Sequence, residues 1–401
     1  MTSLESGIKE QAHALGFELV GIAPATPADG FDRLREWLDQ GYAGEMNYMH
    51  RQADARRHPD SILAEVRSVV MVGMNYKPDI VGWVESSKPT HDTQGGFRRL
   101  HPPYSTAQVA RYARGEDYHH VLWKKLSRLL EWIQGEVPGC TGRGVVDTAP
   151  LLERDFARRA GLGWFGKNTM LIDKRLGSYF FLGGLLLDVP LQTDRPHESS
   201  HCGTCTACLD ACPTQAFTEP GVLDSRRCIS YLTIELHGPI PENLREPMGD
   251  WLFGCDICQE VCPWNRKSPP GLEPALQARP DLTNIDLLEL LTLSEEQFRH
   301  RFRGTALMRT KRQGLLRNAA IVLGNQGNPS ALPTLRKAFE SSTPLRQCLC
   351  RLLWVEKKDC VGKVSKLPAL DTLHFANLLM ERSNRLYAKL TTCRYLSRSV
   401  W

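Results

Sequence analysis

Eight cysteines lie within one 61-residue stretch of the chain, and their spacing is typical of iron–sulfur proteins. The first four form a C-x2-C-x2-C-x3-C-P run, and the last three repeat its end as C-x2-C-x3-C-P. In such runs three closely spaced thiolates surround one cubane, whereas the fourth cysteine reaches a second cubane. The chemistry to expect is electron transfer. The spacing predicts two [4Fe–4S] clusters, one on Cys202, Cys205, Cys208 and Cys262 and the other on Cys212, Cys228, Cys255 and Cys258.

The pattern departs from a symmetric two-cluster ferredoxin at one position. Leu252 stands three residues before Cys255, where symmetry would place a cysteine, so Cys228 must serve from across a 26-residue insertion. A pair of zinc sites is the alternative, because C-x2-C pairs also suit zinc. Three cysteines at two-residue intervals fit a cubane better than a single tetrahedral ion, so we favour the clusters.

Three stretches of different composition must position these cysteines, and together they predict a multidomain α+β protein. Alternating helices and strands indicate an N-terminal α/β domain over residues 1–195, the cysteines mark a ferredoxin-like domain over 196–280, and residues 281–401 look all-helical. Residues 77–107 are rich in Pro, Gly, Ser and His and indicate a long loop. Hydrophobic periodicity predicts helices over 4–15, 31–40 and 117–134 and strands over 17–22, 68–75, 144–146, 170–172 and within 179–188.

The helical part contains a weak internal repeat. The segment Leu316-Arg317-x-Ala-x-Ile-Val-Leu is echoed 29 residues later by Leu345-Arg346-x-Cys-x-Cys-Arg-Leu. Two helices per unit of about 30 residues resemble short HEAT-like repeats, which stack into a concave surface. Two unrelated amphipathic helices are the alternative.

Charge is distributed unevenly along the chain. Residues 301–401 carry 19 Lys and Arg against 5 Asp and Glu, a net charge of +14, whereas residues 1–300 carry a net charge of −9. A basic end on an acidic protein favours a polyanionic partner, and we expect nucleic acid rather than an ordinary solvated helical surface. No acidic residue occurs from 301 to 320, and the candidate phosphate contacts there are Arg301, Arg303, Arg309, Lys311, Arg312 and Arg317.

The N-terminus and the hydropathy of the chain bear on its compartment. The start, Met1-Thr-Ser-Leu-Glu, has no apolar core like that of a signal peptide, and no apolar run is long enough to span a membrane. We therefore expect a cytoplasmic protein without a membrane partner. Thiols stay reduced in that compartment and are available to metal.

A second informative block precedes the cysteines and runs VVDTAPLLERDFARRAGLGWFGKNTMLI over residues 145–172. Together with the cysteine pattern it closely resembles the epoxyqueuosine reductase family. The resemblance spans the chain and includes ARYARGEDYH at 110–119 and SYLTIE at 230–235. It implies reduction of epoxyqueuosine to queuosine at the wobble position of Asp, Asn, His and Tyr tRNAs by a monomer that uses cobalamin and two [4Fe–4S] clusters. It also implies an N-terminal cobalamin-binding domain of the nitroreductase and reductive dehalogenase type and a HEAT-like tail that binds tRNA.

Removing an epoxide oxygen as water requires a strong reductant and an acid. In the family reduced cobalt serves as the reductant and the clusters supply it with single electrons. A carboxylic acid whose pKa is raised in a desolvated pocket can protonate the oxygen. Asp147 matches the family's proton donor and follows a predicted strand, although an Asx turn or cap before Pro150 is the alternative. Glu153 and Asp155 are the other candidates, and we expect them on a helix, paired with Arg154.

The residues that would contact the corrin are less clearly marked. Asp117-Tyr-His119 begins a cobalamin-type D-x-H-x-x-G motif, but Leu122 replaces the glycine, so we expect His119 to be a helix residue. This agrees with the family, in which no protein side chain binds the cobalt. The glycine-rich stretch suggests Lys167 and Asn168 as cofactor contacts, and Arg57 is a further candidate. A tight turn and an exposed basic pair are the respective alternatives.

Three other functions compete with this interpretation. A corrinoid enzyme like the reductive dehalogenases could act on a small molecule, although the basic tail argues against it. A plain electron carrier would bind no corrin. A zinc-bound RNA-binding protein would contain zinc instead of iron. The physiological electron donor is not indicated by the sequence.

Overall fold

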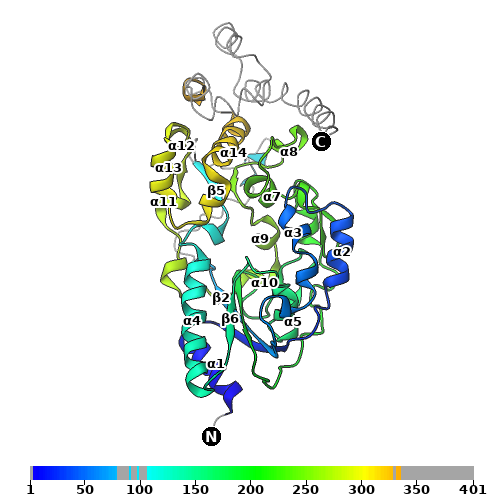
Figure 1. The fold of residues 1–401 in the computed structure, drawn as a ribbon. Coiled ribbons are helices and arrows are strands. Elements are labelled where there is room, and N and C mark those ends of the chain that lie inside the picture. The colour runs from blue at the N-terminus through cyan, green and yellow to red at the C-terminus, as the bar shows by residue number, and fades with distance from the viewer. Residues whose placement is uncertain (1–2, 79–89, 92–96, 99–105, 328–330, 336–401) are drawn as a thin grey trace, which may run out of the picture.

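The N-terminal part is built on a four-stranded antiparallel sheet with the strand order β1-β2-β9-β6 and with helices on both faces (Figure 1). The computed structural model describes residues 3–78, 90–91, 97–98, 106–327 and 331–335. The elements of this part are α1 (Leu4–Ala14), β1 (Leu19–Pro24), α2 (Phe31–Asp39), α3 (Asn47–Arg51), β2 (Ser68–Asn75), β3 (Thr90–His91), β4 (Phe97–Arg98), β5 (Thr106–Val109), α4 (Tyr118–Glu136), β6 (Gly142–Val145), α5 (Glu153–Arg159), β7 (Trp164–Phe165), β8 (Leu171–Ile172) and β9 (Phe180–Leu187).

Strand β2 has a mostly apolar sequence because both of its faces are buried. Side chains alternate between the two faces of a strand. Val70 and Val72 pack into the core formed with α1 and α4, whereas Val69 and Met71 pack into the core formed with α5. Because both faces of the sheet are covered, every residue of β2 is buried.

Helix α4 places its first residues beside the end of the sheet. Its N-cap is Asp117, whose carboxylate accepts a hydrogen bond from the backbone N–H of His119 at 3.1 Å. Leu122, Leu126, Leu129 and Ile133 recur at helical spacing and are buried against the sheet. This packing fixes the helix rotation and therefore the direction in which His119 points.

The cysteine part consists of short helices and strands in and around the two cysteine runs. Helix α6 lies within the first run and α9 within the second, and the two helices are in contact. The elements are α6 (Ala207–Asp210), β10 (Phe217–Glu219), β11 (Val222–Leu223), α7 (Ile229–Ile234), α8 (Glu242–Arg245), β12 (Trp251–Phe253), α9 (Ile257–Glu260) and α10 (Pro263–Arg266).

The last described helices pack on α7 rather than standing apart (Figure 1). Thr310 Oγ1 donates a hydrogen bond to the carbonyl of Thr233 at 3.0 Å, and Asn318 Nδ2 donates to the same carbonyl at 2.8 Å. These helices therefore pack on α7, the helix that begins directly after Cys228. The elements are α11 (Pro280–Thr283), β13 (Ile285–Asp286), α12 (Leu287–Thr292), α13 (Glu295–Phe302), the 3-10 helix η6 (Ala306–Thr310) and α14 (Lys311–Gln326).

Strand β5 joins the three predicted domains in one core. It pairs in parallel with β12 and antiparallel with β13. One cluster of buried apolar side chains accordingly contains Val109 from the N-terminal part, Phe253 from the cysteine part and Leu316 from the C-terminal helices.

The predicted helices and strands outside the long loop are confirmed, with boundaries shifted by a few residues. The N-terminal sheet differs from an ordinary α/β sheet in that all its pairs are antiparallel. Most of the expected loop 77–107 and the second copy of the HEAT-like repeat lie outside the described residues. No helix in the described part has the length and hydropathy needed to cross a membrane.

Candidate active site and cysteine centres

Four of the eight cysteines line one cavity of about 270 Å³. They are Cys202, Cys205, Cys208 and Cys262, which is the set that the spacing assigns to the first cluster. Ile172 and Trp264 form part of the same wall. Cys205 is the exposed member, because its loop faces solvent.

The other four cysteines gather beside this cavity. Burial raises the pKa of the Cys228 thiol, and the nearby Cys212 adds to the effect. Burial also raises the pKa of Cys255, with Cys228 and Cys258 as neighbours. For Cys258, burial is followed by the influence of Cys228, Cys208 and Cys212, so the two groups of cysteines adjoin each other. Buried thiolates this close would repel one another, and a cationic iron centre is the kind of group that stabilises such a donor set.

Lys167 and Asn168 contact the cysteine loops. Lys167 Nζ donates hydrogen bonds to the carbonyls of Gly203 and Cys205 at 2.8 and 2.9 Å. Asn168 is buried, and its Nδ2 donates to the carbonyl of Cys258 at 3.2 Å. In the structure these two residues hold one loop from each cysteine run, so their assignment to the corrin stays a prediction.

Asp147 lies between two cationic side chains from distant parts of the chain. Its Oδ2 is 3.0 Å from Arg309 Nη2, on η6, and 3.5 Å from His119 Nε2, on α4. His119 is held from behind by Asp117, whose Oδ1 lies 2.7 Å from its Nδ1. Asp147 itself has a positive φ of 54°, which an Asp tolerates better than most residues. His119 is a helix residue, as expected, but its contact with the carboxylate was not predicted from the sequence.

These neighbours correct the expectation that the pKa of Asp147 is raised. Burial would raise it, but the ion pairs with His119 and Arg309 outweigh burial and hold the pKa of Asp147 well below its ordinary value. Burial would lower the pKa of His119, but Asp117 and then Asp147 raise it to about 9. At neutral pH the pair is therefore an ionised carboxylate beside a protonated imidazole.

Glu153 is the carboxyl group in this site whose pKa is raised. Burial, and then the charge of Asp147, raises the pKa of Glu153 to about 8. Its Oε1 accepts a hydrogen bond from the backbone N–H of Asp147 at 2.5 Å. Asp155 points elsewhere and accepts from the backbone N–H of Asp29 at 2.8 Å. Arg154 donates to the carbonyl of Thr169, so the expected pairing of Asp155 with Arg154 is wrong.

Arg57, the other predicted corrin contact, is exposed and has its guanidinium 4.6 Å from the centre of the Phe31 ring. Its neighbour Arg56 is buried and donates to the carbonyl of Gln52 at 3.0 Å. The structure thus leaves Arg57 free to meet a ligand but shows nothing that requires one.

The six predicted phosphate contacts divide into three groups. Arg312 and Arg317 are buried and donate to backbone carbonyls, Arg312 to Leu293 and Arg317 to Leu232, so the expectation that they reach phosphates is wrong. Their charges instead hold α14 to the segments beneath it.

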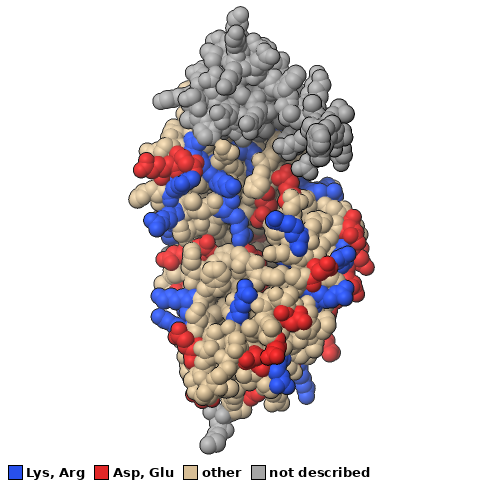
Figure 2. All heavy atoms as spheres, viewed as in Figure 1, with Lys and Arg blue, Asp and Glu red and all other residues tan. Residues whose placement is uncertain are grey.

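Arg309 belongs to the Asp147 site, and Arg301 is half-buried in an ion pair with Glu289 at 2.9 Å. Arg303 and Lys311 are the exposed candidates outside the Asp147 ion pair, in which Arg309 is itself 42% exposed. Lys and Arg side chains gather on the upper part of the face that Figure 2 shows, over α13 and the start of α14.

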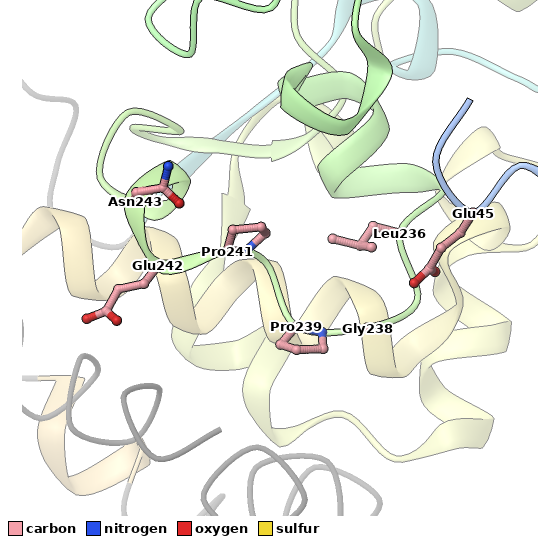
Figure 3. Close-up of a pocket in the computed structure, with 7 residues that line it drawn as sticks. All are labelled: Glu45, Leu236, Gly238, Pro239, Pro241, Glu242 and Asn243. Carbon is pink, nitrogen blue, oxygen red and sulfur yellow. The ribbon is translucent and has the colours of Figure 1, made fainter. Parts of the chain in front are cut away.

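A larger cavity of about 550 Å³ lies beyond the C-terminal end of α7 (Figure 3). It is mostly apolar, and its charged residues are acidic, so it does not suit a phosphate backbone. None of the predicted site residues lines it. The lining residues are Glu45, Leu236, Gly238, Pro239, Pro241, Glu242 and Asn243.

Two family models match the chain. The model described as 4Fe-4S double cluster binding domain matches residues 201–265, which contain all eight cysteines. The model described as epoxyqueuosine reductase QueG (DUF1730) matches residues 56–148, which end just after Asp147.

Relatives and solved structures extend these matches over most of the chain. The epoxyqueuosine reductase of Pseudomonas aeruginosa is 44% identical over 346 residues, covering 84% of this chain and 91% of the relative. That of Escherichia coli K12 is 40% identical over 345 residues, covering 86% and 87%. A crystal structure of an epoxyqueuosine reductase with an epoxyqueuosine-modified tRNA-Tyr stem loop is 27% identical, with a TM-score of 0.78 over 95% of this chain and 99% of that one. A Bacillus subtilis structure gives the same identity and TM-score over 96% and 98%.

Proposed function

The chain belongs to the epoxyqueuosine reductase family, and we propose that its two cysteine centres and the Asp147 site together carry out the family's reaction. The protein is an oxidoreductase that reduces epoxyqueuosine in tRNA to queuosine and carries a double [4Fe–4S] domain. One observation supports this proposal. The eight cysteines lie in two adjoining groups of four, and the same fold brings Asp147, His119 and Arg309 together.

The reaction fixes what the site must supply. Conversion of an epoxide to an alkene consumes two electrons and two protons, breaks both carbon–oxygen bonds and releases the oxygen as water. Each [4Fe–4S] cluster transfers one electron at a time, so a domain that would hold two clusters suits a two-electron reduction. Cys202, Cys205, Cys208 and Cys262 would hold one cluster, and Cys212, Cys228, Cys255 and Cys258 the other.

Cobalamin is the proposed second cofactor, on the strength of the sequence resemblance. Reduced corrin supplies a strong reductant that can act directly at carbon. Tyr48, on α3, and Phe165, on β7, are 39% and 41% exposed. Each exposed ring offers an apolar face against which a large, flat ligand can pack. We propose Tyr48 and Phe165 as contacts and keep Arg57, Lys167 and Asn168 as further candidates.

Asp147 is the proposed proton donor to the departing oxygen. In the structure its carboxylate is ionised, so the proton must come from a neighbour at the moment of reaction. Protonated His119, with its Nε2 3.5 Å from Asp147 Oδ2, is placed to supply it. Glu153 holds the backbone N–H of Asp147 and so positions the carboxylate.

The proposed partner of the C-terminal helices is tRNA. Exposed Arg303 and Lys311 would meet tRNA phosphates, with Arg309 at the edge of the reaction site. The proposed substrates are the Asp, Asn, His and Tyr tRNAs, and the proposed state is a cytoplasmic monomer. An unidentified electron donor would supply the clusters. The division into residues 1–195, 196–280 and a HEAT-like 281–401 stands as a working division, although β5 links all three parts.

Turnover of a defined substrate tests the proposal. Protein reconstituted without oxygen, supplied with cobalamin and a chemical reductant, should convert an epoxyqueuosine-containing anticodon stem-loop to the queuosine form, detected by nucleoside analysis. Unmodified epoxyqueuosine after prolonged incubation, from protein with its full iron content, would refute it. Nucleosides of tRNA from cells lacking the gene provide the second readout, because epoxyqueuosine should accumulate there.

A further inference from the structure

Trp123 is a large apolar side chain that remains 43% exposed beside the reaction site. It lies on α4 one turn after His119, and the centroids of the two rings are 6.4 Å apart at an interplanar angle of 66°. His119 in turn contacts Asp147. One helical turn advances about 5.4 Å along the axis, so Trp123 lies next to the reaction site without forming part of it.

The surroundings of Trp123 indicate the kind of ligand that would cover it. Helix α4 contains no Asp or Glu from Tyr118 to Leu130, and Lys124 and Arg128 are exposed on the same helix. An apolar protein partner would favour further apolar residues around the ring. An exposed aromatic ring on a basic surface is instead a combination with which proteins bind single-stranded nucleic acid, because bases stack on the ring and phosphates meet the cations.

The substrate supplies such bases. The modified base must leave the stack of the anticodon loop to reach Asp147, and its neighbours thereby lose a stacking partner. Successive stacked bases are about 3.4 Å apart and extended ones further, so one helical turn corresponds to one or two nucleotides. We propose that Trp123 stacks on a base adjacent to the wobble base and so holds the anticodon loop open. This inference rests on the proposed function, because it takes the RNA substrate as given.

Binding of an anticodon stem-loop to the reconstituted holoprotein, measured over a series of salt concentrations, tests the inference. Trp123→Ala should raise Kd roughly 5- to 100-fold at every salt concentration. The slope of log Kd against log salt should not change, because an indole carries no charge to release counterions. Trp123→Phe should retain most of the affinity, since it keeps an aromatic face. Leu272→Ala, which also removes exposed apolar surface, is the matched control and should bind like the unaltered protein.

An RNA with a missing base identifies the stacking partner. Stem-loops that carry an abasic nucleotide on either side of the wobble position should bind the unaltered protein more weakly at one of the two positions. Trp123→Ala should not weaken the binding of that same RNA any further, because the two changes remove the same stacking contact.

Two results would overturn the inference while leaving the proposed function standing. One is an affinity for the intact stem-loop that Trp123→Ala does not change, and the other is an equal loss from each abasic RNA in both proteins. Loss of bound cobalamin in Trp123→Ala would also overturn it, because the ring would then face the cofactor. If Trp123→Ala does not fold, Trp123→Gln against Trp123→Phe provides the same comparison. Failure of the unaltered holoprotein to bind any stem-loop would instead refute the proposed function.

Discussion

Arg309 Nη2 lies 3.0 Å from Asp147 Oδ2, although the two residues are 162 positions apart in the chain. The arginine comes from η6, among the C-terminal helices, and the aspartate follows β6 in the N-terminal sheet. The contact joins the part of the protein assigned to RNA with the part assigned to chemistry. It also explains why the carboxylate is ionised in the protein without substrate.

Replacing Arg309 should affect the chemical step more than RNA binding. Arg309→Gln removes the positive charge that lowers the pKa of Asp147, and it leaves the exposed Arg303 in place. We expect kcat to fall at least about tenfold, because one ion pair that positions the acid is lost, with a smaller change in KM. Arg303→Gln is the matched control and should raise KM with little change in kcat. The reverse pattern would assign Arg309 to phosphate binding.

The pH dependence of turnover should report His119. Its pKa is about 9 in the folded protein against an ordinary value of 6.5, so the protonated form persists at neutral pH and is lost as pH rises through about 9. We expect kcat to decline along that limb, and we expect His119→Gln to lack the limb and to turn over slowly at all pH values. The same sign applies to stability. The ion pair contributes fully below pH 6.5, and its contribution disappears above about pH 9. A profile in which His119→Gln keeps the alkaline limb would exclude this role.

Asp147→Asn should abolish turnover without loss of cofactors. Asn tolerates the positive φ of 54° at this position, whereas Ala would add strain to the loss of the carboxyl group. We expect a fall in kcat on the order of 10²- to 10⁴-fold, as for loss of a general acid. Iron content and the spectrum of bound cobalamin are the readouts that separate this outcome from a folding defect. Loss of either cofactor would make Asp147 a structural residue.

Single cysteine substitutions should remove one cluster at a time. Cys262→Ala should lower the iron content from about eight to about four per chain, because Cys262 lines the first centre only. Cys228→Ala should remove the other four, and the double variant should retain none. Cys140→Ala is the control, since Cys140 is a buried free cysteine outside both groups. Zinc instead of iron in metal analysis of the reconstituted protein would contradict the cluster assignment.

The salt dependence of RNA binding should distinguish exposed from buried arginines. Arg303→Ala and Lys311→Ala should each lower the slope of log K against log salt by about 0.7 to 0.9, because each would contact one phosphate. Arg317→Ala should leave the slope unchanged and lower the melting temperature, because its guanidinium is buried and hydrogen-bonded to backbone carbonyls. A lower slope with Arg317→Ala would show that burial in the free protein does not persist in the complex.

The cysteine centres could be predicted from the sequence because a cubane imposes short, fixed spacings on its ligands. Cys228, which stands far from the second run in the sequence, lies near Cys212 and Cys255 in the structure, and its assignment to the second cluster stays a prediction. The long helices and strands could be predicted for a similar reason, since Leu122, Leu126 and Leu129 show their helical period directly. In both cases the constraint acts on residues close together in the sequence, so the spacing of those residues shows it.

The environment of Asp147 could not be predicted, because it depends on contacts between distant segments. Nothing near Asp147 in the sequence shows that His119 and Arg309 will lie against it, and the lowered pKa of the carboxyl group follows from those two contacts. The basic cluster after residue 300 was misleading for the same reason. Arg312 and Arg317 cannot be told apart in the sequence from exposed arginines that contact phosphates. The packing of α14 buries their side chains.

Helix α7 connects the cysteine part with the helices that carry Arg309. It starts immediately after Cys228, and its carbonyls at Leu232 and Thr233 accept hydrogen bonds from Arg317, Asn318 and Thr310. A change in the position of this short helix would therefore move the loop of Cys228 and the support of η6 together.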